Sequence, residues 1–188
     1  MYQFSISGAA RGESVEEGRQ LATELGKALA KAGHSLLTGA TTGLPNYASE
    51  GYKAAGGKMC VGISPAASKV EHILKYRLPT ASYDFILYTG LHYVGRDTLL
   101  ITSSDAVLSI GGRLGTLHEF TIALETGTPV GILHGAGGIS DEINKLMEIS
   151  TPHRNNTVIC FSDSAEDLIN QLTKHLDEEN SKYLKILK

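Results

Sequence analysis

Short apolar runs alternate with longer amphipathic stretches along the whole sequence, and this alternation restricts the fold more than any other feature. Strand-like apolar runs occupy residues 2–7, 34–38, 58–63, 84–89, 105–110, 129–134 and 157–162. Apolar side chains recur with helical spacing in residues 14–32, 47–54, 90–104, 115–127, 140–149 and 164–180. Strands that are apolar throughout and separated by helices are typical of a parallel sheet covered on both faces.

The pattern therefore predicts an α/β fold of the Rossmann-like type. We expect a single doubly wound, mostly parallel sheet of about seven strands, with helices on both faces. No linker, repeat or low-complexity segment divides the chain, so residues 1–188 are expected to form one domain.

Two local expectations concern helix boundaries. Ser14 and Glu17 have the spacing of a capping box, which predicts that the first helix opens there and ends at Gly33. Residues 64–82 contain Pro65 and Pro79 and are expected to form a loop.

Composition excludes several classes of function. The net charge is −3 and no cluster of Lys or Arg marks one segment, so we expect no nucleic-acid partner. No apolar run reaches the ~18 residues of a membrane span, and the amino terminus does not resemble a signal peptide. We expect a cytoplasmic protein with no membrane contact, in which Cys60 and Cys160 are buried free thiols. The seven histidines lack ligand spacing, so no metal site is expected.

The stretch GGRLGT, at residues 111–116, is the strongest candidate for a ligand site. It joins the strand-like run 105–110 to a helix, and ligands of doubly wound folds bind beyond the carboxyl ends of such strands. Gly111, Gly112 and Gly115 allow the backbone to approach a ligand closely, and Thr116 adds a hydroxyl in the first helical turn. Glycines that serve packing alone are the alternative.

Two further turns are expected beside this one. The turn after the first strand-like run contains Gly8, and the turn after the second contains Gly39, Thr41, Thr42 and Gly43. Neither has the dinucleotide G-x-G-x-x-G spacing, and no Gly-Lys-Ser/Thr of a phosphate-binding P-loop occurs.

Glu119 lies one helical turn beyond Gly115, on the same side as the turn. A carboxylate beside an anion site could hold ribose hydroxyls or stabilise positive charge at an anomeric carbon. A favourable acidic residue near a helix amino terminus is the alternative interpretation.

The stretch GGRLGTLHE resembles the PGGxGTxxE signature of the Lonely Guy (LOG) type phosphoribohydrolases, also called lysine-decarboxylase-like proteins. This family includes cytokinin riboside 5′-monophosphate phosphoribohydrolases, and its wider superfamily includes the molybdenum cofactor carrier proteins. Residues 34–65 are similar to the Gly-rich segment of the family, and the order of elements matches over residues 2–133.

The resemblance implies roles for individual residues. Gly112, Gly115 and Thr116 would bind the nucleotide phosphate, and Glu119 would be the catalytic glutamate. Arg96 takes the place of the arginine that holds phosphate or pairs with the glutamate.

The chain departs from the signature at three places. Gly111 replaces its proline, Arg113 its second glycine, and Asp97 the lysine after the arginine. Arg113 could crowd the turn or add a contact to phosphate. In the second turn, Ala40 and Thr41 stand where the hydrolases are more Gly-rich. These departures fit the carrier branch at least as well as the hydrolases.

Four other side chains are secondary candidates. His92 lies one helical turn before Arg96 and could share its face, whereas His118 is expected to point away from Glu119. Tyr83 and Tyr88 flank the fourth strand-like run and are expected mainly to pack in the core.

Two functions that use this site remain open, and an interaction module with a vestigial pocket is the third alternative. The chain binds a phosphorylated nucleotide-like ligand and hydrolyses the N-glycosidic bond of a nucleoside 5′-monophosphate, or it carries or senses a nucleotide or pterin ligand such as molybdenum cofactor. Neither function calls for a resident cofactor. The resemblance further implies a homo-oligomer, a dimer or larger.

Overall fold

A single sheet of seven parallel strands forms the centre of the protein, as the sequence predicts. The computed structural model describes residues 1–149 and 157–186. The strand order is β4-β3-β2-β1-β5-β6-β7. The strands are β1 (Gln3–Gly8), β2 (Ser35–Thr38), β3 (Cys60–Ser64), β4 (Phe85–Tyr88), β5 (Ala106–Ile110), β6 (Val130–Leu133) and β7 (Ile159–Ser162). The order reverses at β1, which pairs with β2 on one side and β5 on the other.

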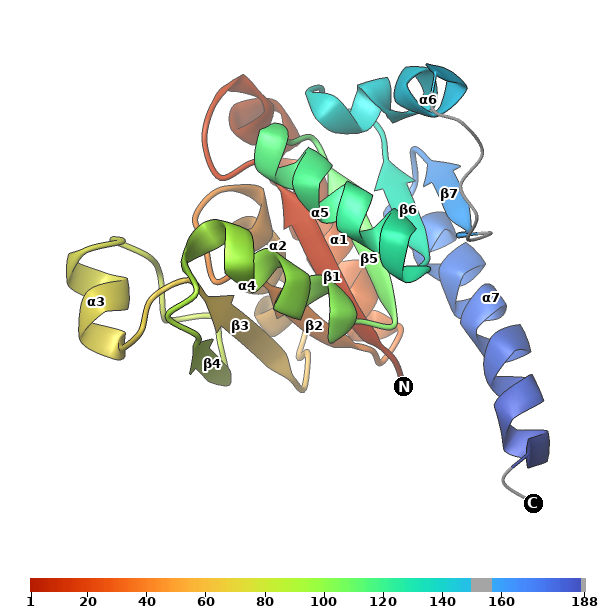
Figure 1. Ribbon diagram of the computed structural model, residues 1–188, viewed down its shortest axis with the longest axis horizontal. Helices are drawn as coiled ribbons and strands as arrows, with labels where there is room; N and C mark the ends of the chain where they lie inside the picture. Colours follow the sequence, from red (N-terminus) through yellow and green to blue (C-terminus); the bar gives the residue numbers. More distant parts are fainter. Residues whose placement is uncertain (150–156, 187–188) are drawn as a thin grey trace.

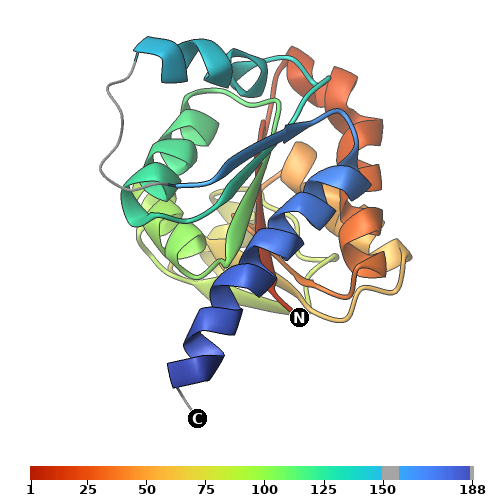
Figure 2. The same cartoon turned by 90° about the vertical axis from the view of Figure 1, so that its right-hand side faces the viewer.

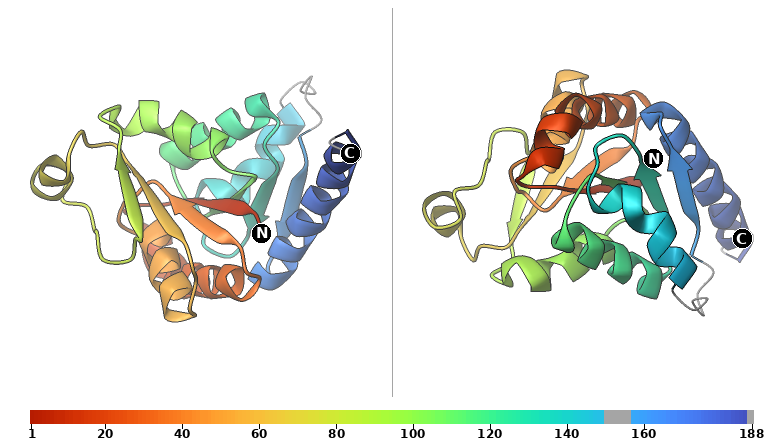
Figure 3. Two further views of the ribbon diagram at one scale, coloured as in Figure 1. Left: turned by 90° about the horizontal axis from the view of Figure 1, so that it is seen from below. Right: turned by 90° about the horizontal axis from the view of Figure 1, so that it is seen from above.

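Helices cover both faces of this sheet (Figures 1 and 3). One face carries α1 (Glu13–Lys31), α2 (Leu44–Ala54) and α7 (Ala165–Ile186), and the other carries α4 (His92–Thr102), α5 (Leu114–Thr126) and α6 (Ile139–Ile149). Helix α7 runs along the end of the sheet formed by β6 and β7 (Figure 2). The short helix α3 (Lys69–Leu74) stands apart from these layers (Figure 1).

The alternation of side chains along each strand places apolar cores on both faces of the sheet. Phe4 and Ile6 of β1 belong to the core beneath α1, α2 and α7, whereas Val107 of β5 belongs to the core beneath α5 and α6. Ser5 and Ser7 of β1 point away from the first core and are nevertheless buried. This alternation places the Ser7 hydroxyl on the side of the sheet that α5 covers.

Helix α3 corrects the expectation of a loop over residues 64–82. Ser68 caps this helix, because its hydroxyl accepts a hydrogen bond of 3.1 Å from the backbone N–H of Glu71. The apolar side chains of the helix are largely exposed, so no apolar core announces it in the sequence.

The capping box expected at Ser14 and Glu17 is also wrong. Helix α1 begins at Glu13, one residue before Ser14, and no side chain caps it. Gly12, with φ of 100°, makes the turn into the helix instead. At the other end, Gly33 follows the helix in the left-handed conformation, as expected.

Candidate functional site

A pocket of about 290 Å³ opens where β1, β2 and β5 end. This is the point at which the strand order reverses, so the chain leaves neighbouring strands in opposite directions and a crevice remains between the turns. The pocket is lined by Ile6, Gly8, Ala9, Ala10, Arg11, Gly39, Thr41, Pro45, Tyr93, Arg96, Asp97, Arg113, Gly115, Thr116 and Glu119.

The turn after β5 shapes one wall of this pocket. Gly111 and Gly112 have φ of 57° and 101°, which favour glycine, and a Cβ at Gly112 would lie 2.3 Å from the Thr116 hydroxyl. Arg113 then occupies the N-cap position of α5, and no side chain caps the helix. The amino terminus of α5 therefore faces the pocket at Gly115 and Thr116 with uncapped backbone N–H groups.

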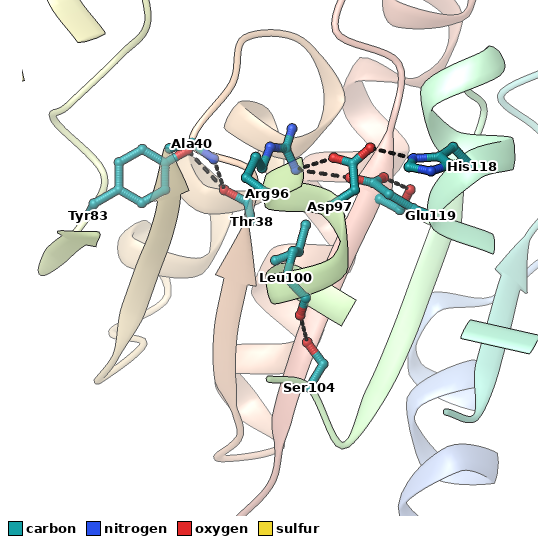
Figure 4. A network of polar contacts seen from close by, with 10 residues as sticks. Thr38, Ala40, Tyr83, Arg96, Asp97, Leu100, Ser104, His118 and Glu119 are labelled. Carbon is teal, nitrogen blue, oxygen red and sulfur yellow. Dashed lines mark hydrogen bonds and ion pairs between the residues drawn. The ribbon is translucent and has the colours of Figure 1, made fainter. Parts of the chain in front are cut away.

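A buried ion cluster forms the floor of the pocket (Figure 4). The Arg96 guanidinium donates a hydrogen bond of 3.0 Å to Glu119 and also lies 3.2 Å from the Asp97 carboxylate. The Ser7 hydroxyl donates to the other oxygen of Glu119. His118 bonds to the second oxygen of Asp97 at 2.8 Å. One guanidinium thus faces two carboxylates, and all three side chains are almost fully buried.

Burial raises the pKa of the Glu119 carboxyl above its ordinary value, while the Arg96 guanidinium opposes this rise. The negative charge of Asp97 adds to the rise, because it repels a charge on the Glu119 carboxylate. One hydrogen-bond donor of Arg96 is unsatisfied, because its buried Nε has no hydrogen-bond partner among the described residues.

Gly39 fixes the position of Arg96. A Cβ at Gly39 would lie 2.2 Å from the guanidinium carbon and from both terminal nitrogens. The glycine in the turn after β2 is needed for this close approach of a side chain, in addition to any approach of a ligand.

The mouth of the pocket is cationic. Arg11, from the turn after β1, and Arg113 both line it and are exposed. Within residues 1–149 and 157–186 neither of them has an ion-pair partner, and the Arg113 side chain lies near Gly12 of the first turn. Two unpaired guanidinium groups beside a helix amino terminus favour an anion at this end of the pocket.

The structure brings most of the sequence-predicted site residues into this pocket. The residues that line it are Gly8, Gly39, Thr41, Arg96, Arg113, Gly115, Thr116 and Glu119. Gly111 and Gly112 lie behind the wall, where their carbonyls accept hydrogen bonds from α6. Thr42 lines a neighbouring hollow, and Gly43 is packed against the backbone of the first turn.

The secondary candidates take other places. His118 does not contact Glu119 directly, but it joins the cluster through Asp97. His92 lies outside the pocket and bonds to Tyr76. Tyr83 is half-buried against the first core and bonds to Thr38 at 3.0 Å, and Tyr88 packs on His72.

Four residues of the site do not stand out in the sequence. Ser7 could be predicted as a site residue only by assigning alternate positions of the first strand to the face that α5 covers. Arg11 could be predicted only by placing its turn beside Arg113. Asp97 follows Arg96 directly, and Tyr93 precedes it by one helical turn. The signal for Tyr93 was the helix face that it shares with Arg96, and the signal for Asp97 was its departure from the family signature.

No group of three or more His, Cys, Asp or Glu side chains that could hold a metal ion occurs in the described part of the chain. Of the helices described, none is long and apolar enough to cross a membrane. Both cysteines are free thiols: Cys60 is buried, as expected, whereas Cys160 is only half-buried.

Comparisons with known proteins agree with this arrangement. The profile of the SLOG cluster4 family (LDcluster4) matches residues 1–169. An uncharacterised protein from Archaeoglobus fulgidus is 32% identical over 133 residues, which are 71% of this chain and 80% of that protein.

Two solved structures share the fold over nearly their full length. The X-ray structure of TM1055 is 28% identical, with a TM-score of 0.80, and the match covers 93% of this chain and 99% of that one. The molybdenum cofactor binding protein from the phototrophic bacterium Rippkaea orientalis is also 28% identical, with a TM-score of 0.71, over 93% of this chain and 97% of that one.

Proposed function

Because this chain belongs to the SLOG cluster4 family, we propose that its pocket binds a phosphorylated nucleotide-like ligand. The family confirms the superfamily resemblance carried by GGRLGTLHE. The observation that carries the proposal is the pairing, in one pocket, of a cationic mouth with a buried Arg96–Glu119 pair. A ligand with an anionic group and a neighbouring group rich in hydroxyls matches such a pocket. The anionic group suits the cationic mouth, and the hydroxyls suit the Arg96–Glu119 pair.

The phosphate lies at the mouth in this proposal. Backbone N–H groups at Gly115 and Thr116 donate to its oxygens, and Arg11 and Arg113 neutralise its charge. Gly111 and Gly112 act indirectly, by setting the turn that presents these groups.

Hydrolysis of the N-glycosidic bond is the reaction that Glu119 supports. The carboxylate holds the ribose hydroxyls and stabilises positive charge at C1′ as the bond to the base breaks. The oxygen of a water molecule then bonds to C1′, the bonding electrons leave with the base, and the proton of the water ends on the base. Arg96 opposes the rise that burial causes in the pKa of Glu119 and so favours the carboxylate form.

Carriage without turnover is the second candidate. The observation that favours it is the likeness to the molybdenum cofactor binding protein, which is 28% identical and covers 93% of this chain. The same mouth would hold the phosphate of a pterin ligand, and the Arg96–Glu119 pair would hold its polar ring edge. Glu119 would then anchor the ligand and break no bond.

One experiment distinguishes the two functions. Purified protein is incubated with a panel of nucleoside 5′-monophosphates that includes AMP and N6-substituted AMP, and free base is followed by chromatography. The hydrolase predicts base release that Glu119→Gln abolishes, while the variant still shows a thermal shift with the same nucleotide. The control Glu178→Gln removes a carboxylate on α7, far from the pocket, and should leave release unchanged.

The outcomes differ clearly. A thermal shift without base release supports the carrier, whereas the absence of both contradicts binding of a nucleotide. Ligand at ~100 times its dissociation constant should raise the free energy of unfolding by ~2.7 kcal/mol, which a melting curve resolves.

We also propose that the chain forms a homo-oligomer through the face made by α3, β4 and α4. Exposed apolar side chains gather there: Val70, Ile73, Leu74, Phe85, Leu87, Leu91, Tyr93, Val94 and Leu99. Tyr93 belongs both to this face and to the pocket, so a second copy of the chain would lie beside the pocket mouth.

A further inference from the structure

A second hollow adjoins the proposed ligand pocket. It also measures about 290 Å³ and shares Ala10, Arg11, Thr41 and Tyr93 with the first pocket, so the two are neighbours across a common wall. Its remaining lining residues are Thr42, Tyr76, Arg77 and Leu78, most of which come from the segment that follows α3. A nucleoside monophosphate bound in the first pocket would leave this space unfilled.

The wall of the second hollow is aromatic and held in place. The rings of Tyr76 and Tyr93 pack edge to face, with centroids 5.6 Å apart and planes at 79°. Tyr76 is further fixed by a 2.6 Å hydrogen bond between its hydroxyl and Nδ1 of His92. A preorganised aromatic surface of this kind suits a flat ring, because stacking requires no rearrangement of the wall.

Three arginines are distributed over the two hollows. Arg113 lines the first hollow alone, Arg11 lines both, and Arg77 lines the second alone. All three are exposed and lack ion-pair partners among the residues that the structure describes. A single phosphate at the α5 amino terminus uses Arg113 and Arg11 but leaves Arg77 without a partner.

The backbone around the second hollow is strained. Within residues 1–149 and 157–186, the non-glycine residues with positive φ are Ala40 (50°), Arg77 (55°) and His92 (57°). Ala40 precedes the lining residue Thr41, Arg77 lines the hollow, and His92 holds Tyr76. Non-glycine residues keep a positive φ only where the surrounding structure enforces it, and they are frequent at ligand-binding sites.

We propose that the second hollow holds the second half of a dinucleotide whose two nucleosides are joined by a pyrophosphate. The first phosphate lies at the α5 amino terminus, the second passes Arg11 toward Arg77, and the second base stacks on Tyr76 and Tyr93. This inference rests on the proposed function, because the first half of the ligand occupies the pocket described above.

Equilibrium binding of three probes to the purified protein tests the parts of this ligand one at a time. AMP tests the first pocket, ADP adds the second phosphate, and diadenosine pyrophosphate adds the second base. We expect the dissociation constant to fall from AMP to ADP and again to diadenosine pyrophosphate, with an overall gain of about tenfold or more.

Two matched variants locate the gain. Arg77→Gln should weaken binding of ADP and diadenosine pyrophosphate about tenfold while leaving AMP unchanged, and Arg77→Lys should restore part of the loss. Lys69→Gln removes the same charge from exposed α3, outside the hollow, and should change none of the three constants. Tyr76→Leu should remove the gain of diadenosine pyrophosphate over ADP.

Equal affinity for AMP and diadenosine pyrophosphate would overturn the inference and leave the proposed function standing. An equal loss for all three probes in Arg77→Gln would overturn it as well, since Arg77 would then act on the first pocket. Binding of none of the three would contradict the proposed function itself.

Discussion

Gly39 shows how one missing side chain positions the charged centre of the site. The Arg96 guanidinium lies where a Cβ of residue 39 would be, and from there it reaches both Glu119 and Asp97. A buried cation is tolerated only when it is paired, so the position of Arg96 also bears on the stability of the fold.

Gly39→Ala is therefore expected to displace Arg96. The free energy of unfolding should fall by about 1–3 kcal/mol, because an overpacked site shifts its neighbours and weakens a buried pair. Urea denaturation measures this loss. Gly115→Ala is the control: a Cβ there meets no atom within 4 Å, so stability should not fall, whereas nucleotide affinity should, because Gly115 lines the pocket. Equal stability of Gly39→Ala and the wild type would contradict the assigned role.

Glu119 predicts a pH dependence of stability. Burial raises its pKa from the ordinary 4.5, so the folded state holds the proton more tightly than the unfolded state. The stabilising contribution is fully present below pH 4.5 and is lost as the pH rises through the folded pKa.

The comparison of the wild type with Glu119→Gln isolates this effect, since the amide does not titrate. We expect the free energy of unfolding of the wild type, relative to the variant, to decrease as the pH rises above 4.5. Urea curves at a series of pH values measure it, and contributions from other groups, such as His34, cancel in the difference. Parallel curves would show that Glu119 has an ordinary pKa.

At the scale of residues, the sequence predicts the parts of the site that carry a local signal. Gly115, Thr116 and Glu119 lie in one recognisable stretch, and Arg96 follows from the family resemblance. Ser7 and Arg11 could not be found in the same way, because each enters the site only through the pairing of β1 with β5.

Helices α1 and α2 approach each other more closely than ordinary side chains allow. A Cβ at Gly26 of α1 would lie 1.9 Å from the carbonyl oxygen of Ala48, and one at Gly51 of α2 would lie 2.2 Å from that of Thr23. Because α1 follows the turn of β1 and α2 follows the turn of β2, this contact sets the distance between two walls of the pocket.

Gly26→Ala should consequently destabilise the protein by about 3 kcal/mol or more, since the added carbon meets backbone that cannot move alone. Thermal unfolding measures the loss, and Gly115→Ala serves again as the helical glycine with open space. A melting temperature for Gly26→Ala equal to that of the control would mean that the helices can separate without cost.

At the scale of elements, the strands are predicted best. All seven apolar runs correspond to strands, because a parallel sheet buried on both faces leaves a continuous apolar signal. Helix α3 was missed because its apolar side chains face outward, and Val70 and Leu74 are 66% and 72% exposed. The Ser68–Glu71 spacing is a local signal for its start, which the expectation of a loop based on Pro65 and Pro79 did not use.

The exposed apolar face of α3, β4 and α4 is a property of the whole molecule. Val94, on α4, is 70% exposed. If a second copy covers this face, Val94→Lys should shift the mass measured by light scattering toward the monomer, because the contact would then bury a charge. Tyr183→Lys is the control, since Tyr183 is an exposed apolar residue on α7, away from the face. Monomeric wild-type protein would contradict the proposal.

The proposal of one domain over residues 1–188 predicts a single cooperative transition. Urea unfolding followed by circular dichroism and by tyrosine fluorescence should give coincident curves, because the pairing of β1 with β5 joins the two halves of the sheet. The chain has no tryptophan and eight tyrosines, of which seven lie in residues 2–93, so tyrosine fluorescence mainly follows the first half of the sequence, whereas circular dichroism follows both. Separate transitions would divide the chain into two units.

The pairing of β1 with β5 also has a consequence for synthesis on the ribosome. Phe4 emerges long before its partner Ala106, which follows only after β2, β3 and β4 have been made. Closing so long a loop is slow, and the pocket does not exist until it is closed and Glu119 has joined it. The ligand therefore cannot stabilise the nascent chain at an early stage. It binds and stabilises only those molecules in which β1 and β5 have paired.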